Sequence, residues 1–389
     1  MNSKIMQSST KIWTLNPNMR LRQQATRKPL VTFQWRAVNK WLRTIMDKEW
    51  YIRLTHKEFW PMHFLYPLAI VSYPIWALRA KSWLFFTAAN PGIETGGMIG
   101  ESKEEINKLI PPQYRPKNAL IAVGEKPNIV KMRLLVANFS YPLIAKPVVG
   151  ARGLMVEKVE DFDQLMAHIT RFSVDFIVEE FIDYPVEAAV LYWKNPVSLE
   201  SGIQSITLKS FLSVVGNNTD TVKDLLKKNF RGILQIDRLM REKPELMAHI
   251  PANGEDILVE PIGNHCRGTM FLNGNDLINE EMVTAFDKIQ ANLKGCYFFR
   301  LDLKVPSVSD LQKGQNIKIL EINGVGSEPA HIYDPNYPLW KSWRDTWLMW
   351  AKMYEVSEAN NFLGIPYQSL KEFKTFMKRQ DDFVDAGKN

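Results

Sequence analysis

Two segments of the chain decide its fold: residues 296–305, CYFFRLDLKV, and residues 317–329, IKILEINGVGSEP. Each is an apolar run of strand length that carries a pair of polar side chains two positions apart. Successive side chains of a strand point to opposite faces. Arg300 and Asp302 should therefore share one face of the first strand, and Glu321 and Asn323 one face of the second.

Carboxylate and amide oxygens are the ligands that Mg²⁺ prefers. Asp302, Glu321 and Asn323 are the candidate metal ligands, and Arg300 beside them could stabilise charge on a phosphorylated, tetrahedral centre. The alternative is a surface ladder of salt bridges. It is the weaker reading because both strands are apolar on either side of these residues, and partly buried carboxylates without a partner are costly.

A third segment, YPLIAKPVVGARGLMVEKV at 141–159, predicts a hairpin in which the first strand delivers Lys146. A lysine at a strand end can contact a phosphate. In the connecting loop, Gly150 and Gly153 allow backbone N–H groups to approach other phosphates, and Arg152 could join them. An ordinary hairpin with a surface lysine is an equally good interpretation of this segment alone.

A fourth segment, FIVEEFIDYPVEAAVLYW at 176–193, predicts a strand that ends near Glu179, Glu180, Phe181 and Ile182. An extended backbone there could meet an adenine edge, and Glu187 on the next strand could accept ribose hydroxyls. A solvated acidic turn is the better interpretation if the segment is considered by itself.

The order and spacing of these four segments resemble the ATP-grasp superfamily, and most closely its D-alanine–D-alanine ligase-like branch of carboxylate–amine ligases. The resemblance covers about 126–335. It implies an α+β ATP-grasp fold, in which two α+β lobes clasp ATP. It also implies an ADP-forming ligase that activates a carboxylate as an acyl-phosphate and joins it to an amine or similar nucleophile.

The resemblance implies a role for each matched residue. Lys146 and Lys209 would contact the nucleotide phosphates, with Lys209 and Arg300 serving catalysis. Glu180 and Ile182 would lie at the adenine and Glu187 at the ribose. The cofactors would be ATP and one or two Mg²⁺ ions, with Mn²⁺ as an alternative. The loop that contains Gly326 and Ser327 would border the acceptor site.

The chain also departs from the family pattern. The loop after Lys146 is less rich in serine, and the first nucleotide-binding lysine has only Lys126 and Lys131 as candidates. Residues 213–262 form a longer connection than the ligases need, and the first 80 residues match nothing in them. Neither substrate can therefore be carried over.

Two other segments are candidate substrate sites. NHCRGT at 264–269 is expected to place His265 and Arg267 on a strand, where Arg267 could bind a carboxylate. A structural ion pair is the somewhat better alternative. NPGIETGGMIGESK at 90–103 combines glycines with Glu101, and it fits a substrate pocket and a turn-rich connector equally well.

The basic character of the chain is confined to its start. Residues 1–58 hold 12 Lys/Arg and 3 Asp/Glu, a net charge of +9, whereas the remaining chain carries −2. Such an arm could meet anionic lipid, or it could be a solvated extension. Nucleic acid is a weaker candidate because no recognised binding motif is present.

The segment FWPMHFLYPLAIVSYPIWAL at 59–78 has no charged residue. Its length could span a bilayer, but three prolines and basic flanks on both sides argue against a span. We expect peripheral attachment slightly before internal packing, and either before a span. Only two cysteines and no secretory signal at the start predict a cytoplasmic protein, with the cytoplasmic membrane surface as a candidate partner.

The predicted domains are an arm with an apolar segment at 1–79, a small α/β lobe at 80–125, the ATP-grasp domain at 126–335 and a helical tail at 336–389. The lobe is expected to begin with a strand at 83–86. A second hypothesis is a membrane-surface scaffold or sensor that binds nucleotide with little ligase activity. The complete set of predicted metal ligands argues against it.

Overall fold

The structure is a computed structural model, and it describes residues 46, 48–98, 103–148 and 155–386. Chain contacts separate residues 1–48 from Glu49–Asn389, and every helix and strand below belongs to the second unit. The candidates Glu101, Gly150, Arg152 and Gly153 lie outside the described residues, so their placement stays a prediction.

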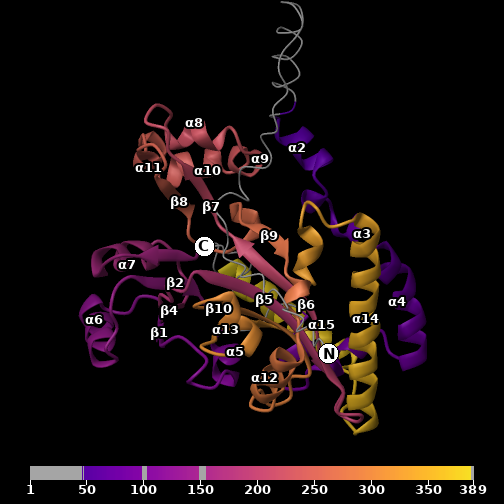
Figure 1. Cartoon of the computed structure of the whole chain (residues 1–389). Helices are drawn as coiled ribbons and strands as arrows, with labels where there is room; N and C mark the ends of the chain where they lie inside the picture. The colour runs from indigo at the N-terminus through magenta and orange to yellow at the C-terminus, as the bar shows by residue number, and fades with distance from the viewer. Residues whose placement is uncertain (1–45, 47, 99–102, 149–154, 387–389) are drawn as a thin grey trace, which may run out of the picture. The chain divides into compact units, whose positions relative to one another are not determined.

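A five-stranded antiparallel sheet carries the two segments that open the sequence analysis (Figure 1). Its strand order is β11-β10-β5-β6-β9. In that order the strands are Lys318–Asn323, Phe298–Val305, Val186–Lys194, Ser201–Ser210 and Met270–Asn273. The predicted strands at 186–193, 296–305 and 317–323 are confirmed within a few residues.

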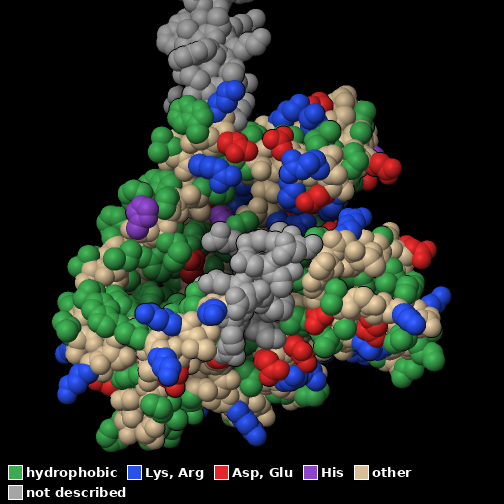
Figure 2. Space-filling view, turned by 180° about the vertical axis from the view of Figure 1, so that it is seen from behind, with side chains coloured by type: hydrophobic (Ala, Val, Ile, Leu, Met, Phe, Trp, Pro, Cys, Tyr) green, Lys and Arg blue, Asp and Glu red, His purple; other side chains and the backbone are tan. Residues whose placement is uncertain are grey.

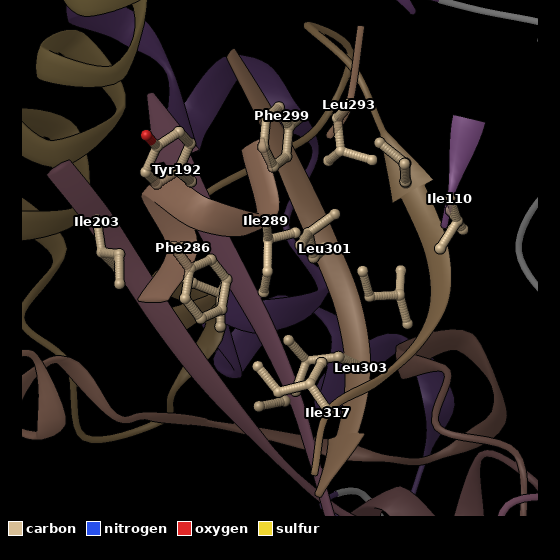
Figure 3. Packing of buried hydrophobic residues seen from close by; sticks show 14 of the residues in the cluster. Ile110, Tyr192, Ile203, Phe286, Ile289, Leu293, Phe299, Leu301, Leu303 and Ile317 are labelled. Atoms are coloured by element: carbon tan, nitrogen blue, oxygen red, sulfur yellow. The ribbon is translucent and has the colours of Figure 1, made fainter. Parts of the chain in front are cut away.

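One face of this sheet is packed with apolar side chains (Figure 3). Phe299, Leu301 and Leu303 of β10 point to this face, where Phe286 and Ile289 of α12 meet them. The helices that contribute to this core are α5 (Lys103–Leu109), α12 (Glu280–Gln290) and α13 (Val308–Lys313). The strict alternation of β10 leaves its other face for polar groups.

A second sheet has four strands in the order β1-β4-β2-β3. These strands are Asn118–Ile121, Phe176–Glu180, Leu143–Pro147 and Glu157–Val159, with α6 (Pro127–Val136) and α7 (Phe162–Ile169) contributing to their core. The predicted hairpin is confirmed, because β2 and β3 pair antiparallel. The predicted domain limits stay predictions, but β1, expected in an 80–125 lobe, is hydrogen-bonded to β4.

The long connection after β6 forms a small folded insert with its own core. Its two strands, β7 (Leu212–Val215) and β8 (Asp256–Glu260), pair antiparallel. Its helices are α8 (Val222–Leu226), α9 (Phe230–Ile233), α10 (Ile236–Glu242) and α11 (Pro244–Ala248). The long connection noted at 213–262 is thus occupied mainly by several short helices and a two-stranded sheet.

Residues before β1 and after β11 fold together. Tyr66, Trp76 and Phe85 share one core with Met349 and Met353 of α14. The helices of this region are α2 (Glu49–Thr55), η2 (Lys57–Phe59), α3 (Met62–Leu65), α4 (Pro67–Ala80), η3 (Phe85–Ala89), η4 (Glu94–Gly96), η7 (Ala330–Tyr333), α14 (Leu339–Phe362) and α15 (Leu370–Ala386). The helical character of the predicted tail is confirmed.

The strand predicted at 83–86 is wrong. The chain forms the 3₁₀ helix η3 there, and Phe85 and Phe86 are buried in the core shared with α14. A short apolar run does not distinguish a buried strand from a buried helical turn. The apolar segment 59–78 folds as η2, α3 and α4. Within the described residues, no helix combines the length and apolarity that a membrane crossing requires.

The core in Figure 3 yields a stability prediction. Phe286 is fully buried between α12 and the sheet, so Phe286→Ala should lower the free energy of unfolding by about 3–5 kcal/mol. Chemical denaturation monitored by tryptophan fluorescence measures the change. Met132→Ala on the exposed side of α6 is the control and should change stability by less than about 1 kcal/mol. Equal losses in the two variants would contradict the assigned core.

Candidate functional site

The register of β10 against β11 brings the predicted metal ligands together. Arg300 lies opposite Asn323, and Asp302 lies opposite Glu321. Directly opposed residues share one face of a sheet, with Cβ atoms about 4.5–5.5 Å apart. Asp302, Glu321 and Asn323 therefore sit on one face, opposite the core of Figure 3.

Neighbouring strands add further charges to this face. Lys209 on β6 donates to Glu187 Oε1 at 2.8 Å and to Asp302 Oδ2 at 3.0 Å. Arg300 Nε donates to Asp302 Oδ1 at 2.8 Å. Four side chains from three strands thus form one charge network, and the predicted catalytic pair Lys209 and Arg300 meets at Asp302. We call these four residues the charged cluster.

The charged cluster fixes the ionisation of its members. Burial by itself would raise the pKa of Asp302, but the charges of Arg300 and Lys209 outweigh burial and hold that pKa at about 2. Burial likewise opposes the charge on Lys209, yet Asp302 and Glu187 raise its pKa. Asp302 is therefore a carboxylate at neutral pH, which is the form that a metal ligand requires.

Lys146 lies where the second sheet meets β11. Its Nζ is 2.7 Å from Glu179 Oε1 on β4 and donates to the carbonyl of Leu320 at 3.4 Å. Leu320 directly precedes the predicted ligand Glu321, so the lysine is adjacent to the charged face. Asn107 also donates to Glu179, at 3.1 Å. Glu179 thus orients Lys146, and its carboxylate faces a lysine and an amide.

The predicted adenine segment follows β4. The backbone N–H of Glu180 donates to the carbonyl of Lys117 at 2.9 Å, which anchors the end of the strand. The ring of Phe181 has Lys158 Nζ at 4.7 Å and Lys304 Nζ at 5.1 Å from its centroid. The carbonyl of Ile182 accepts from Lys304 at 3.0 Å. An aromatic ring and backbone groups do lie together here, next to cations.

Lys304 was missed in the sequence analysis. It is buried, its Nζ lies 3.9 Å from Glu187 Oε2, and burial lowers its pKa. The signal was present, because residue 304 continues the alternation of 300 and 302 on β10. The register of the sheet was needed to show that the continuation reaches Glu187 and Ile182.

His265 and Arg267 do not lie on a strand, contrary to the prediction. They form the 3₁₀ helix η5 (His265–Arg267), which Asn264 caps through the N–H of Cys266. Arg267 Nε donates to the fully buried Glu260 at 2.9 Å. His265 stacks on Phe59 and Tyr333, and burial lowers its pKa to about 4. These contacts favour the structural alternative for Arg267.

The loop after β11 packs on the glycine-rich segment near residue 96. The N–H groups of Val325 and Gly326 donate to the carbonyls of Gly96 and Gly97 at 3.1 and 2.9 Å. A Cβ on Gly324 would lie 2.4 Å from the Gly96 oxygen, so only glycine fits. Ser327 Oγ donates to the Gly324 carbonyl at 2.6 Å, which stiffens the loop. The glycines of 90–103 thus allow a close backbone contact with the loop after β11.

A tyrosine from the apolar segment reaches the neighbourhood of Arg300. Tyr66 is buried, and its hydroxyl has no hydrogen-bond partner within the described residues. Burial raises its pKa, and Glu328 and Tyr333 raise it further. Arg300 Nη1 donates to the Glu328 carbonyl at 3.4 Å. No sequence motif marked Tyr66, since its proximity depends on the packing of α3 and α4.

A Ser-His-Asp chain begins on the same face of the sheet as the charged cluster, at Ser205 of β6. Ser205 Oγ is 2.9 Å from His331 Nδ1, and His331 Nε2 is 3.0 Å from Asp345 Oδ2. The pattern resembles an activated nucleophile. Ser205 and His331 are each only 1% exposed, however, so a substrate cannot reach the hydroxyl. This chain is a structural link between β6, η7 and α14.

The residues at the charged face suit a magnesium ion. Among the described residues, no group of three or more His, Cys, Asp or Glu side chains could hold a metal ion. Mg²⁺ needs fewer protein ligands, because one or two carboxylates plus phosphate oxygens are common. Asn323 Nδ2 is buried without a partner inside the described part of the chain, and as an N–H donor it fits a phosphate oxygen, whereas the amide Oδ1 is the atom that could coordinate a cation.

The comparisons with known proteins give partial structural likeness. No protein-family model matches the chain, and no curated protein matches it. Solved structures that do match are a D-Ala:D-Ser ligase, VanG, from Enterococcus faecalis (14% identity, TM-score 0.39, 68% of this chain and 64% of that chain) and a D-alanine–D-alanine ligase from Bacillus anthracis (13%, 0.38, 69% and 70%). A bifunctional glutathione synthetase from Pasteurella multocida matches over 57% of this chain and 32% of its own (15%, 0.30).

The chain spans 64% of the length of the E. faecalis ligase. Likeness at these TM-scores assigns neither residues nor substrates, so the site rests on the register and contacts described above.

The charged cluster yields a pH prediction. The pKa of Asp302 is about 2 in the folded chain and about 3.9 when unfolded, so its ionised form stabilises the fold above that higher value, and the contribution is lost as pH falls toward 2. Asp302→Asn should cost about 2 kcal/mol or more of unfolding free energy near pH 6. The difference in unfolding free energy between this variant and the wild type should fall by about half at pH 3.

Urea unfolding of both proteins across this pH range measures this difference. Asp276→Asn, an exposed aspartate next to β9, leaves the charged cluster intact and is the matched control. A difference that stays constant with pH would contradict the depressed pKa of Asp302.

Proposed function

We propose that the chain is an ATP-dependent carboxylate–amine ligase whose nucleotide phosphates and metal ion bind at the charged face. One observation carries the proposal: the register sets Arg300 opposite Asn323 and Asp302 opposite Glu321, on the face that holds Lys209. The resemblance of the four motifs to ATP-grasp ligases supports it, since that family uses such residues for MgATP.

The nucleotide would lie between the two sheets. Lys146 faces this junction through its contact with the Leu320 carbonyl, and it can donate to phosphate oxygens. Phe181 and the backbone up to Ile182 offer an apolar surface and polar edges to the base. Glu187, already hydrogen-bonded to Lys209, lies on the strand that follows and can accept from ribose.

Asp302, Glu321 and Asn323 would hold Mg²⁺ against the phosphates. The ion would neutralise phosphate charge and align the transferred group. Arg300 and Lys209 would supply fixed positive charge beside it. The side chains of Lys209 and Arg300 are only 5% and 18% exposed and are already oriented by Asp302, so little reorganisation is needed at the moment of reaction.

The reaction would have two steps. A substrate carboxylate oxygen attacks the γ-phosphorus of ATP, the bond to the β-phosphate oxygen breaks, and ADP leaves. The amine nitrogen then attacks the carbonyl carbon of the acyl-phosphate, phosphate leaves, and the nitrogen loses a proton. Arg300 would stabilise the negative charge of both centres. The loop that holds Gly326 and Ser327 would border the acceptor amine, as the resemblance implies.

The alternative function is a nucleotide-binding scaffold or sensor with little ligase activity. The contacts do not favour it. A scaffold would not need the charges of Lys209 and Arg300 to be held around Asp302. Removing charged side chains from water costs desolvation free energy, and a role in catalysis would account for that cost.

The metal role predicts the behaviour of Glu321. No hydrogen bond or ion pair to its carboxylate occurs in the described structure, so Glu321→Gln should leave the fold intact. We expect it to slow ADP release by about 100-fold or more, because it removes a metal ligand. Glu355→Gln on the exposed side of α14 is the matched control and should keep wild-type turnover.

ADP release should be screened with Mg²⁺, ATP and amino acids, peptides, sugar acids or lipid-linked acids as substrates. Hydroxylamine can replace the amine and trap an acyl-phosphate as a hydroxamate. Full turnover by Glu321→Gln, or ADP release that no carboxylate stimulates, would refute the ligase proposal.

The phosphate role predicts weaker nucleotide binding by Lys146→Ala. We expect the dissociation constant of ATP to rise about tenfold, because a charge-assisted contact worth roughly 1.5 kcal/mol or more is lost. Isothermal titration calorimetry measures the constant. Lys371→Ala, exposed on α15, is the control. The melting temperature of each variant shows whether Glu179, left without Lys146, disturbs the fold. Unchanged affinity would remove Lys146 from the site.

A further inference from the structure

Apolar side chains are exposed in an unusual concentration on α3, on α4 and Trp83 just after it, and on the first half of α14. We call this surface the apolar face. Its large side chains are between 38% and 74% exposed, and they are Met62, Phe64, Leu68, Ile70, Val71, Ile75, Leu78, Trp83, Trp340, Trp347 and Leu348. Figure 2 shows hydrophobic side chains gathered on the side of the molecule where Figure 1 places α3, α4 and α14.

Helix α4 is apolar on both of its sides. Ala69, Trp76 and Ala77 pack inward in the core shared with α14. Leu68, Val71, Ile75 and Leu78 recur at spacings of four and three residues and form an outward stripe. A helix on the surface of a water-soluble domain normally has a polar outer face. The core therefore explains the inner side of α4 and leaves the outer side unexplained.

Hydrogen bonds make α3, α4 and α14 one continuous surface. Trp343 Nε1 on α14 donates to the Phe64 carbonyl at 2.8 Å. Trp347 Nε1 donates to Ser72 Oγ on α4 at 3.0 Å. The exposed residues of the three helices thus belong to a single fixed face. Scattered exposed apolar residues are ordinary, but a contiguous patch marks an interaction site.

The charges around the apolar face are positive. Residues 59–93 contain no Asp or Glu, and Arg79 and Lys81 are exposed at the end of α4. On the first half of α14, Arg344 is exposed, and the acid Asp345 is mostly buried against His331 and Arg344. The preceding residues 1–58 carry a net charge of +9.

We propose that the apolar face docks on the surface of a bilayer that contains anionic lipid. Exposed tryptophans (Trp83, Trp340 and Trp347) beside apolar and basic side chains match the chemistry of the interfacial region. Each nearby lysine or arginine strengthens binding to an anionic surface. A protein partner is less well matched, because the exposed charges beside the face, Arg79, Lys81 and Arg344, are all basic and complement a uniformly anionic surface.

The same helices cannot cross the bilayer. Helix α4 has 14 residues and is about 21 Å long, shorter than the roughly 30 Å hydrocarbon core. Its inner side is occupied by α14. The helix therefore lies in the plane of the membrane surface, with only its outer stripe in contact with lipid.

Vesicle flotation with the full-length protein tests the proposal. The chain should float with vesicles of equal parts phosphatidylcholine and phosphatidylglycerol, and less with phosphatidylcholine alone. The double variant Val71→Glu, Ile75→Glu places two carboxylates on the outward stripe and should reduce flotation at least about tenfold. The control Leu135→Glu, Val136→Glu makes the same charge change on the exposed side of α6 and should float like the wild type.

All four altered side chains are exposed, so melting temperatures should stay near that of the wild type. Three results would overturn the proposal. The wild type could fail to float with either vesicle. The stripe variant could float as well as the wild type, which would assign binding to the basic arm alone. Sedimentation could show a wild-type dimer that the stripe variant loses, which would make a second copy the occupant. ADP release is independent of these results.

Discussion

The pairing of Asp302 with Lys209 and Arg300 is the interaction on which the site depends. Three strands, β6, β10 and β5, contribute charges to one small volume, and each charge is acceptable there only because the others are present. Removing one partner from a buried ion network leaves an uncompensated charge, at a cost of several kcal/mol. The network thus ties the register of the sheet to its chemistry. A shift of β10 by one residue would put Leu303 in the place of Asp302, which would break the ion network and remove a proposed metal ligand.

The two faces of the five-stranded sheet serve different purposes: one provides hydrophobic stability, and the other carries the charged cluster. The face with Phe299, Leu301 and Leu303 is sealed by helices and supplies hydrophobic stability. The other face carries the charged cluster near β6 and meets the second sheet through Lys146 and Leu320. At its far end, Leu191 and Phe298 join the core of η3, α4 and α14. Segments before β1 and after β11 therefore pack on the face of the sheet that carries the site.

Periodicity predicted the parts of the structure in which local pattern decides the outcome. Alternation on β10 and β11 placed Arg300, Asp302, Glu321 and Asn323 on shared faces, because the side-chain period of a strand is fixed. It could not place Tyr66 or Lys304, whose neighbours are set by tertiary packing. It also failed for 83–86, because a short apolar run does not distinguish a strand from a helical turn. Arg267 was ambiguous for a similar reason, since its partner Glu260 became visible only in the fold.

The hydrogen-bond chain from Ser205 through His331 to Asp345 connects helix α14 to the five-stranded sheet. Ser205 lies four residues before Lys209 on β6, and Asp345 lies on α14, so strand and helix are cross-linked by buried imidazole. A force that tilts α14 must also displace β6. The position of α14 is consequently coupled to the position of β6, the strand that carries Lys209.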